Sequence, residues 1–207
     1  MPSIVTLLTD PNRFFAALED DWGYASPAGV VTVTALVSAA GAYVVMSQLL
    51  GSLGGDVQGV GGIAVGAAVF GGFVGAYVVW GVASVVFFLV SVVFDGEGSL
   101  GKTAAFVGWG FVPRVVGNVV GLALSALALR DVTPPSDVSQ YQAFARQFQH
   151  RPLVVASSVV GVVFLFYSGF VWAFAMKHAR DLSTRGAALT VFVPVGIYAL
   201  YQLVGLL

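Results

Sequence analysis

The chain has 207 residues, of which 58% are hydrophobic and only 9% are charged. Soluble domains carry roughly 25% charged residues, so a water-soluble core could not hide this much apolar surface, and a bilayer is needed to cover it. The net charge of −1, without a basic cluster, argues against nucleic-acid binding, and the lack of Cys excludes disulfides, thiolate metal sites and a Cys nucleophile.

The first 27 residues precede the first apolar run. The run Thr9-Asp10-Pro11 is typical of a helix start, with a capping residue followed by Pro. The helix predicted here has an apolar face formed by Phe14, Phe15 and Leu18. Such an amphipathic helix lies either on the membrane surface or against the other helices, and both alternatives remain open. The acidic charges and the missing cleavage site argue against a secretory signal, so we expect the first span to stay in place.

Five apolar runs match the roughly 20 residues that a membrane span needs. They cover residues 28–50, 66–94, 103–129, 153–176 and 187–207. The second run belongs to an uncharged stretch, 60–94, which predicts one long or tilted helix with a Gly-rich approach. The sequence therefore predicts an all-α integral membrane protein, a five-helix bundle, with residues 1–207 forming a single domain.

Five spans place the termini on opposite sides of the membrane. The side of the N-terminus carries five basic residues, Arg13, Lys102, Lys177, Arg180 and Arg185. The other side carries three, Arg130, Arg146 and Arg151. Because cytoplasmic loops are enriched in Lys and Arg, we expect a cytoplasmic N-terminus and an outer C-terminus.

Two further features concern the packing of the spans. Apolar residues recur at helical spacing in the 130–152 loop, which predicts an interfacial helix over 136–149. Small residues four apart let helices approach closely, and three glycine pairs have this spacing, Gly62/Gly66, Gly71/Gly75 and Gly117/Gly121. We expect at least one pair to lie at a helix contact.

No set of residues typical of catalysis is present. His150 and His178 lie in loops beside basic residues and lack metal-ligand spacing, so both are interpreted as polar side chains at headgroup level. Asp95 and Glu97 are interpreted as solvated loop charges. The 51–62 loop is Gly-rich but lacks the Lys of a phosphate-binding loop. We therefore predict a non-enzymatic protein without metal or cofactor.

Arg114 is the one charged residue inside the five predicted spans, and none of these spans contains Asp or Glu. Intramembrane charges are costly and often functional. Pro113 would break the helix and free a carbonyl, and Asn118 lies one turn further on, so both could solvate the guanidinium. If 101–112 is instead a re-entrant or interfacial helix, Arg114 lies near the membrane surface. Arg114 is thus either structural or, with Asn118, a contact for a ligand or lipid headgroup.

Four stretches of the sequence resemble the Yip family (Ypt-interacting proteins), in its prokaryotic branch. They are LLTDPNRFFAALEDD, GEGSLGKTAAFVGWGFVPRVVGNVVG, FVWAFAMKHARDLSTRGAAL and VFVPVGIY, the last containing Pro194, a second expected helix break. The resemblance covers nearly the whole chain. It implies a five-helix membrane domain with a cytoplasmic N-terminus, in a prokaryotic plasma membrane. Eukaryotic members are associated with Rab-type GTPases, but their long N-terminal region is not expected here, so the resemblance does not support Rab binding.

The functional prediction combines these points. The resemblance implies a membrane-organising or partner-recruiting protein with no established biochemical activity. The expected partners are the lipid bilayer and either another membrane protein or a second copy of the chain. The alternative is a small permease for an anionic solute, with a cavity behind Pro113 and Arg114 lined by Asn118, Tyr43, Tyr77 or Gln48.

Overall fold

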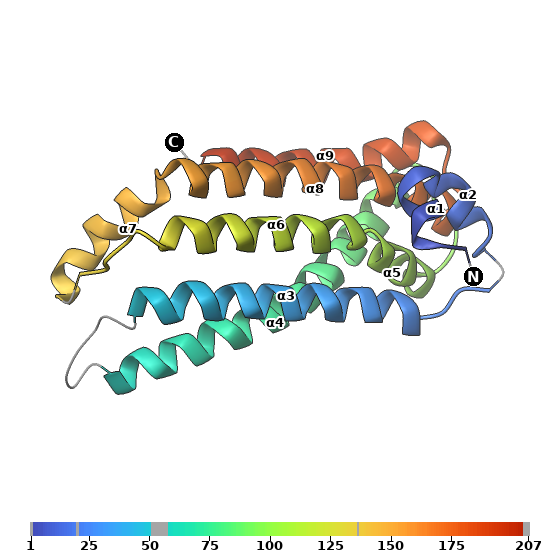
Figure 1. Cartoon of the computed structure of the whole chain (residues 1–207). Coiled ribbons are helices and arrows are strands. Elements are labelled where there is room, and N and C mark those ends of the chain that lie inside the picture. Colours follow the sequence, from blue (N-terminus) through green and yellow to red (C-terminus); the bar gives the residue numbers. More distant parts are fainter. Residues whose placement is uncertain (1, 20, 51–57, 136, 205–207) are drawn as a thin grey trace.

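The computed structural model describes residues 2–19, 21–50, 58–135 and 137–204, and Figure 1 shows a bundle of long helices. Within these residues, five helices are long and apolar enough to cross a membrane, and no strand is present. The five are α3 (Ala25–Leu50), α4 (Gln58–Val92), α6 (Val112–Leu129), α8 (Pro152–Ala179) and α9 (Thr184–Val204). The predicted all-α fold with five spans is confirmed.

Successive long helices run in opposite directions along the bundle. As a result, α1 and the end of α9 lie at opposite ends of the molecule (Figure 1). Helix α3 packs on α4, α6 packs on α3 and α8, and α8 packs on α9. Helix α6 therefore occupies a central position between α3 and α8 (Figure 1).

Helix α4 is the single long helix predicted for the uncharged stretch. It begins at Gln58 rather than at residue 66 and ends at Val92 rather than at 94. Its 35 residues extend over about 52 Å at 1.5 Å per residue, which exceeds a hydrocarbon core of about 30 Å. The helix runs obliquely across α3, as expected for a tilted span (Figure 1). Residues 51–57 of the predicted Gly-rich loop lie outside the described residues.

The third predicted span, 103–129, consists of two helices rather than one. Helix α5 (Leu100–Trp109) ends at Gly110, and α6 follows with Pro113 in its first turn. Pro is favoured there because the first turn does not use its missing N–H. The 18 residues of α6 extend over about 27 Å, close to the thickness of a hydrocarbon core. Pro113 thus stands at the beginning of the actual span.

The second predicted break, at Pro194, is wrong. Helix α9 runs continuously from Thr184 through Pro194 to Val204. A Pro inside a membrane helix removes one backbone donor, and packing against neighbouring helices can compensate for that loss.

The N-terminal segment forms two short helices, α1 (Ile4–Thr9) and α2 (Pro11–Ala16). Asp10 caps α2 as predicted, because its carboxylate accepts the Arg13 N–H at 3.1 Å. Helix α2 therefore begins where the run Thr9-Asp10-Pro11 predicts a helix start.

The predicted apolar face of this segment is buried against the bundle rather than exposed to lipid. Its side chains are at most 5% exposed, and they are Phe14, Phe15 and Leu18. Phe15 stacks on Phe106 of α5, with ring centroids 5.2 Å apart. Phe14 meets Trp109 edge-on at 5.1 Å. Of the two alternatives left open by the sequence, the structure shows packing on the other helices.

At the opposite end of the bundle, α7 (Tyr141–Gln149) follows a 3₁₀ turn, η2 (Val138–Gln140). The helix predicted over 136–149 is present but shorter, and residue 136 lies outside the described part. No residue of α7 is buried. The Tyr141 hydroxyl nevertheless donates to the Leu49 carbonyl at the end of α3, which ties α7 to the bundle.

All four Trp residues gather around α5. Trp80 donates to the Ala104 carbonyl and Trp172 donates to the Val107 carbonyl, each at 2.7 Å. The other two line one small cavity beside α5, and they are Trp22 and Trp109. Three of the four Trp residues, all but the buried Trp172, are at least partly exposed, and we call these three the Trp girdle. Because Trp is enriched where membrane meets water, the Trp girdle indicates that one interface lies at the level of α5.

The prediction that a glycine pair lies at a helix contact is confirmed for Gly117/Gly121. A Cβ on Gly117 would lie 2.7 Å from the Phe164 side chain on α8, and one on Gly121 would lie 3.2 Å from the Ser157 hydroxyl. The other two pairs have no neighbouring atom within 4 Å of the built Cβ. The close approach of α6 and α8 therefore depends on small residues.

Candidate functional site

One end of the bundle gathers segments that lie far apart in the sequence. We define the cap as residues 2–19, 21–24, 93–111 and 177–186, which contain α1, α2, α5 and the turn between α8 and α9 (Figure 1). Its segments share one cluster of buried apolar residues with the adjoining parts of α6 and α8, namely Leu7, Phe14, Phe15, Leu18, Ala105, Phe106, Val112, Val171, Ala175 and Ala179. The cap is therefore packed like the core of a small globular domain.

Arg180, directly after α8, is the buried cation of the cap, with only 3% of its surface exposed. Its Nε donates to the Ser91 hydroxyl at 2.9 Å, its Nη2 to the Gly96 carbonyl at 2.5 Å, and its Nη1 to the Gly98 carbonyl. The guanidinium carbon lies 4.3 Å from the centre of the Phe88 ring. Burial lowers the pKa of Arg180, but arginine starts so high that it stays charged at physiological pH.

The turn that surrounds Arg180 depends on two glycines. Gly98 has a φ of +99°, a backbone conformation that residues other than glycine rarely adopt. A Cβ on Gly96 would lie 2.9 Å from the Ser91 carbonyl oxygen. The backbone N–H of Glu97 donates to the Arg180 carbonyl at 2.9 Å, so the contact runs in both directions. The Gly-Glu-Gly-Ser sequence is thereby explained as a cradle for a buried guanidinium.

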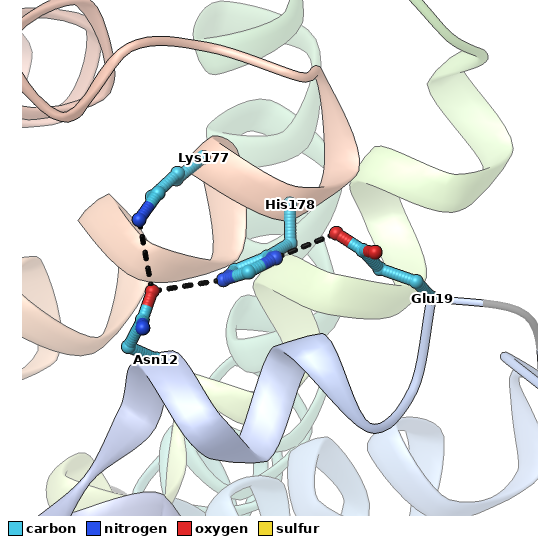
Figure 2. Close-up of polar contacts among 4 residues, drawn as sticks. All are labelled: Asn12, Glu19, Lys177 and His178. Carbon is cyan, nitrogen blue, oxygen red and sulfur yellow. Dashed lines mark hydrogen bonds and ion pairs between the residues drawn. The ribbon is translucent and has the colours of Figure 1, made fainter.

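A second polar contact fastens the N-terminal segment to the end of α8 (Figure 2). The Asn12 side-chain oxygen accepts from Lys177 Nζ at 3.1 Å and lies 3.0 Å from His178 Nε2. The other ring nitrogen, His178 Nδ1, lies 2.6 Å from a Glu19 carboxylate oxygen. We call these four residues the clasp.

The clasp contacts can be assigned to donors and acceptors. Because Lys177 can only donate, the Asn12 atom between them is an oxygen, and His178 Nε2 must donate to it. An ionised Glu19 likewise only accepts, so Nδ1 also donates. The ring thus bridges Asn12 and Glu19 and joins two parts of the N-terminal segment to the end of α8.

The structure does not bring Arg114 and Asn118 together. Asn118 donates to the Ser38 hydroxyl on α3 at 3.1 Å and lines a groove between α3, α6 and α8. Arg114 lines a different cleft, between α4 and α9, where it meets the Tyr198 hydroxyl. The guanidinium also lies 5.7 Å from the Phe111 ring centre. Solvation of Arg114 by Asn118, expected from their spacing, is therefore absent.

The cleft around Arg114 does not have the polar lining that was expected for a permease cavity. Tyr77 bonds the Thr32 hydroxyl at 2.8 Å, and neither Tyr77 nor Asn118 lines the Arg114 cleft. Within the residues that the structure describes, no group of three His, Cys, Asp or Glu side chains could hold a metal ion. The polar contacts of Arg180, Lys177 and His178 in the cap are made to other groups of the protein, which is typical of a structural role.

Comparison with known proteins agrees with this architecture. The family model described as the Yip1 domain matches residues 5–206. The chain belongs to the Yip1 domain family. An uncharacterised protein of Methanocaldococcus jannaschii is 28% identical over 132 residues, which cover 63% of this chain and 93% of that protein. No solved structure matches. The predicted family is confirmed, and the archaeal relative supports its prokaryotic branch.

In this Yip1 family chain, three of the four stretches that carry the resemblance meet in the cap. They supply the clasp residue Asn12, the Gly96–Gly98 cradle and the buried Arg180. The fourth, around Pro194, lies in α9 and lines the Arg114 cleft. The family pattern therefore describes one assembled end of the bundle, together with the cleft below it.

Sequence reasoning missed Arg180 as the organising residue of the cap. The sequence predicts Arg180 to be one of several basic loop residues, but its side chain is buried. Asp95 and Glu97 are exposed, as expected. The sequence does contain the two parts of this contact, namely the two glycines that flank Glu97 and a basic residue after the Trp-bearing span. That signal does not specify a contact between positions more than 80 residues apart.

The clasp predicts a local effect for His178→Ala. The exchange leaves Asn12 and Glu19 without a ring partner, and we expect the free energy that holds the N-terminal segment to fall by about 1 kcal/mol, because Glu19 is half-exposed. Limited proteolysis should cleave residues 2–24 several times faster. His150→Ala, an exposed position at the other end of the bundle, is the control. Equal cleavage of both variants would show that the clasp holds nothing.

Proposed function

We propose that this Yip1 family protein is a non-enzymatic membrane protein that recruits a partner through its cap, with the N-terminus and cap on the cytoplasmic side of a prokaryotic plasma membrane. The observation that carries the proposal is the convergence of three separate segments into one packed cap, fastened by Arg180 and the clasp. Such a rigid surface at the end of a bundle supports recognition. Five basic residues on that side support the orientation.

The charge of the cap indicates the kind of partner. Among the described residues of the cap, six exposed side chains are acidic, namely Asp10, Glu19, Asp21, Asp95, Glu97 and Asp181. Two exposed side chains are basic, Arg13 and Arg185. Complementary potentials steer association, so an acidic surface favours a protein partner with a basic face over an anionic membrane surface. A second copy of the chain, with the same acidic cap, would be repelled at this face.

A charge reversal tests the proposal. We expect Asp21→Lys combined with Glu97→Lys to reduce the recovery of co-isolated protein at least about tenfold, because like charges then face the partner. Both positions are exposed, so the fold should persist. The measurement is quantitative mass spectrometry of the protein extracted with its surrounding membrane. Asp131→Lys, exposed at the other end of the bundle, is the control.

The alternative, a small permease for an anionic solute, makes the opposite prediction. Protein isolated without any partner that conducts anions across liposome membranes would contradict the recruiting role. Co-isolation of one protein, lost in the cap variant and kept in the Asp131 control, would support it.

A further inference from the structure

The cleft around Arg114 is a separate feature of this molecule, independent of the cap and its partner. It has a volume of about 300 Å³ and lies between α4 and α9, with α6 and α8 behind it. Its lining is apolar apart from one cation and one hydroxyl, those of Arg114 and Tyr198. A concave apolar space with few polar groups is the usual form of a ligand site, and this one is at the small end of the range.

The cleft opens towards lipid. Its α4 wall presents Val78 and Val82, which are 55% and 56% exposed, and Tyr198 on α9 is 45% exposed. These residues belong to helices that are long and apolar enough to span the membrane. A ligand would therefore enter sideways from the bilayer, and its surface must be compatible with acyl chains.

The position of Arg114 along the membrane normal defines which part of a lipid it would meet. It lies in the first turn of α6, two residues after Val112 and thus about 3 Å from the start of that span. Trp109, in the Trp girdle, precedes it by five residues, which correspond to about 7 Å at the helical rise. The Tyr167 hydroxyl, from α8, reaches the Leu8 carbonyl of the surface segment in the same region. Arg114 therefore lies just below one headgroup layer.

The charge of Arg114 lacks a counter-ion within the described part of the chain. Its contacts are the Tyr198 hydroxyl and the face of the Phe111 ring, both neutral. Arg180 has a full set of backbone and hydroxyl acceptors, whereas Arg114 has one hydroxyl for five N–H donors. A guanidinium with free donors in an apolar setting is matched by a phosphate or carboxylate, which it binds through two hydrogen bonds.

We propose that the cleft binds an acidic phospholipid of the surrounding bilayer. Its phosphodiester contacts Arg114 and Tyr198, and one acyl chain lies along α4. From Phe87 to Val78 the α4 wall extends over nine residues, about 13 Å, which provides a track for that chain. The headgroup lies at the girdle level, and the chain points towards the bilayer centre, as in the lipid leaflet itself. Pro194 and Val195 form the opposite wall.

Native mass spectrometry of the full chain tests the proposal, with an equimolar mixture of phosphatidylglycerol and phosphatidylcholine as the probe. We expect the wild type to retain phosphatidylglycerol about tenfold better than phosphatidylcholine, because the choline cation of the latter already pairs with its phosphate and would repel Arg114. Arg114→Gln should abolish this preference, whereas Arg114→Lys should keep part of it because the charge remains. Arg146→Gln, an exposed position on α7, is the control and should match the wild type. Inorganic phosphate should not displace the lipid.

A second variant tests the acyl track without touching the charge. Val82→Trp fills the mouth of the cleft from an exposed position, so the fold should hold and retention of both lipids should fall. Thermal unfolding followed by Trp fluorescence checks that each variant is folded. Retention of phosphatidylglycerol by Arg114→Gln at the wild-type preference, unchanged retention by Val82→Trp, or displacement by inorganic phosphate would overturn the proposal. None of these results depends on whether the cap recruits a partner.

Discussion

Gly110→Ala is expected to destabilise the protein by about 3 kcal/mol, because a single methyl group would collide with a buried Trp. A Cβ built on Gly110 lies 2.1 Å from Trp172 Nε1 and 2.2 Å from its Cδ1. The indole is 2% exposed and donates to the Val107 carbonyl, so it cannot move without losing that bond. Gly110 has an ordinary helical φ of −68°, so the requirement is for space rather than for backbone freedom.

Equilibrium unfolding in mixed detergent micelles, followed by Trp fluorescence, measures this effect. The matched control is Gly161→Ala in α8, where no atom lies within 4 Å of the built Cβ. Because Ala favours helix over Gly, the control should be as stable as the wild type or slightly more so. Similar stabilities for the two variants would mean that Trp172 does not pack across the α5–α6 junction as described.

Arg180→Met should cost a similar amount, about 3 kcal/mol, through the loss of charge-assisted hydrogen bonds. Met fills much of the volume, but it leaves the Gly96 and Gly98 carbonyls and the Ser91 hydroxyl without their donor. It also removes the cation from the Phe88 ring. We expect faster hydrogen exchange in residues 93–103 and 177–186, while the spans stay protected.

Two other substitutions show whether the loss of stability in Arg180→Met comes from the charge or from the planar hydrogen-bond geometry of the guanidinium. Arg180→Lys keeps the charge but lacks the planar fork of donors, so it should lie between Met and the wild type. Arg185→Met removes an exposed cation from the first turn of α9, close to Arg180 in the sequence, and should change stability by less than about 0.5 kcal/mol. If Arg180→Met behaved like Arg185→Met, the buried guanidinium would not be what holds the cap together.

The sequence predicts most of the membrane fold because apolar runs and the residues that mark helix ends are local signals. Asp10 and Pro11 start α2, and the 60–94 stretch without charge forms one helix, as its composition indicates. The helix ends differ by a few residues, since apolar composition continues past the membrane boundary into the cap. Pro194 was expected to break a helix, but neighbouring helices hold α9 together.

The candidate site was less predictable because it depends on contacts between distant segments. Spacing suggested that Asn118 would face Arg114, yet Ser38 on α3 competes for its amide. His178 looked like a headgroup-level residue, and its clasp with Asn12 depends on how the N-terminal segment folds back. Arg180 is separated from its cradle by more than 80 residues. Periodicity and local motifs carry no information about such pairings.

Site-specific photo-crosslinking in living cells tests the recruiting role of the cap most directly. A benzophenone amino acid would replace Arg13 or Glu97 in the cap, or Gln147 on α7 at the other end, and all three positions are exposed. The proposed function predicts a discrete protein adduct from the two cap positions, several times stronger than from α7. Adducts of equal strength at both ends, or a protein adduct at α7 alone, would contradict it.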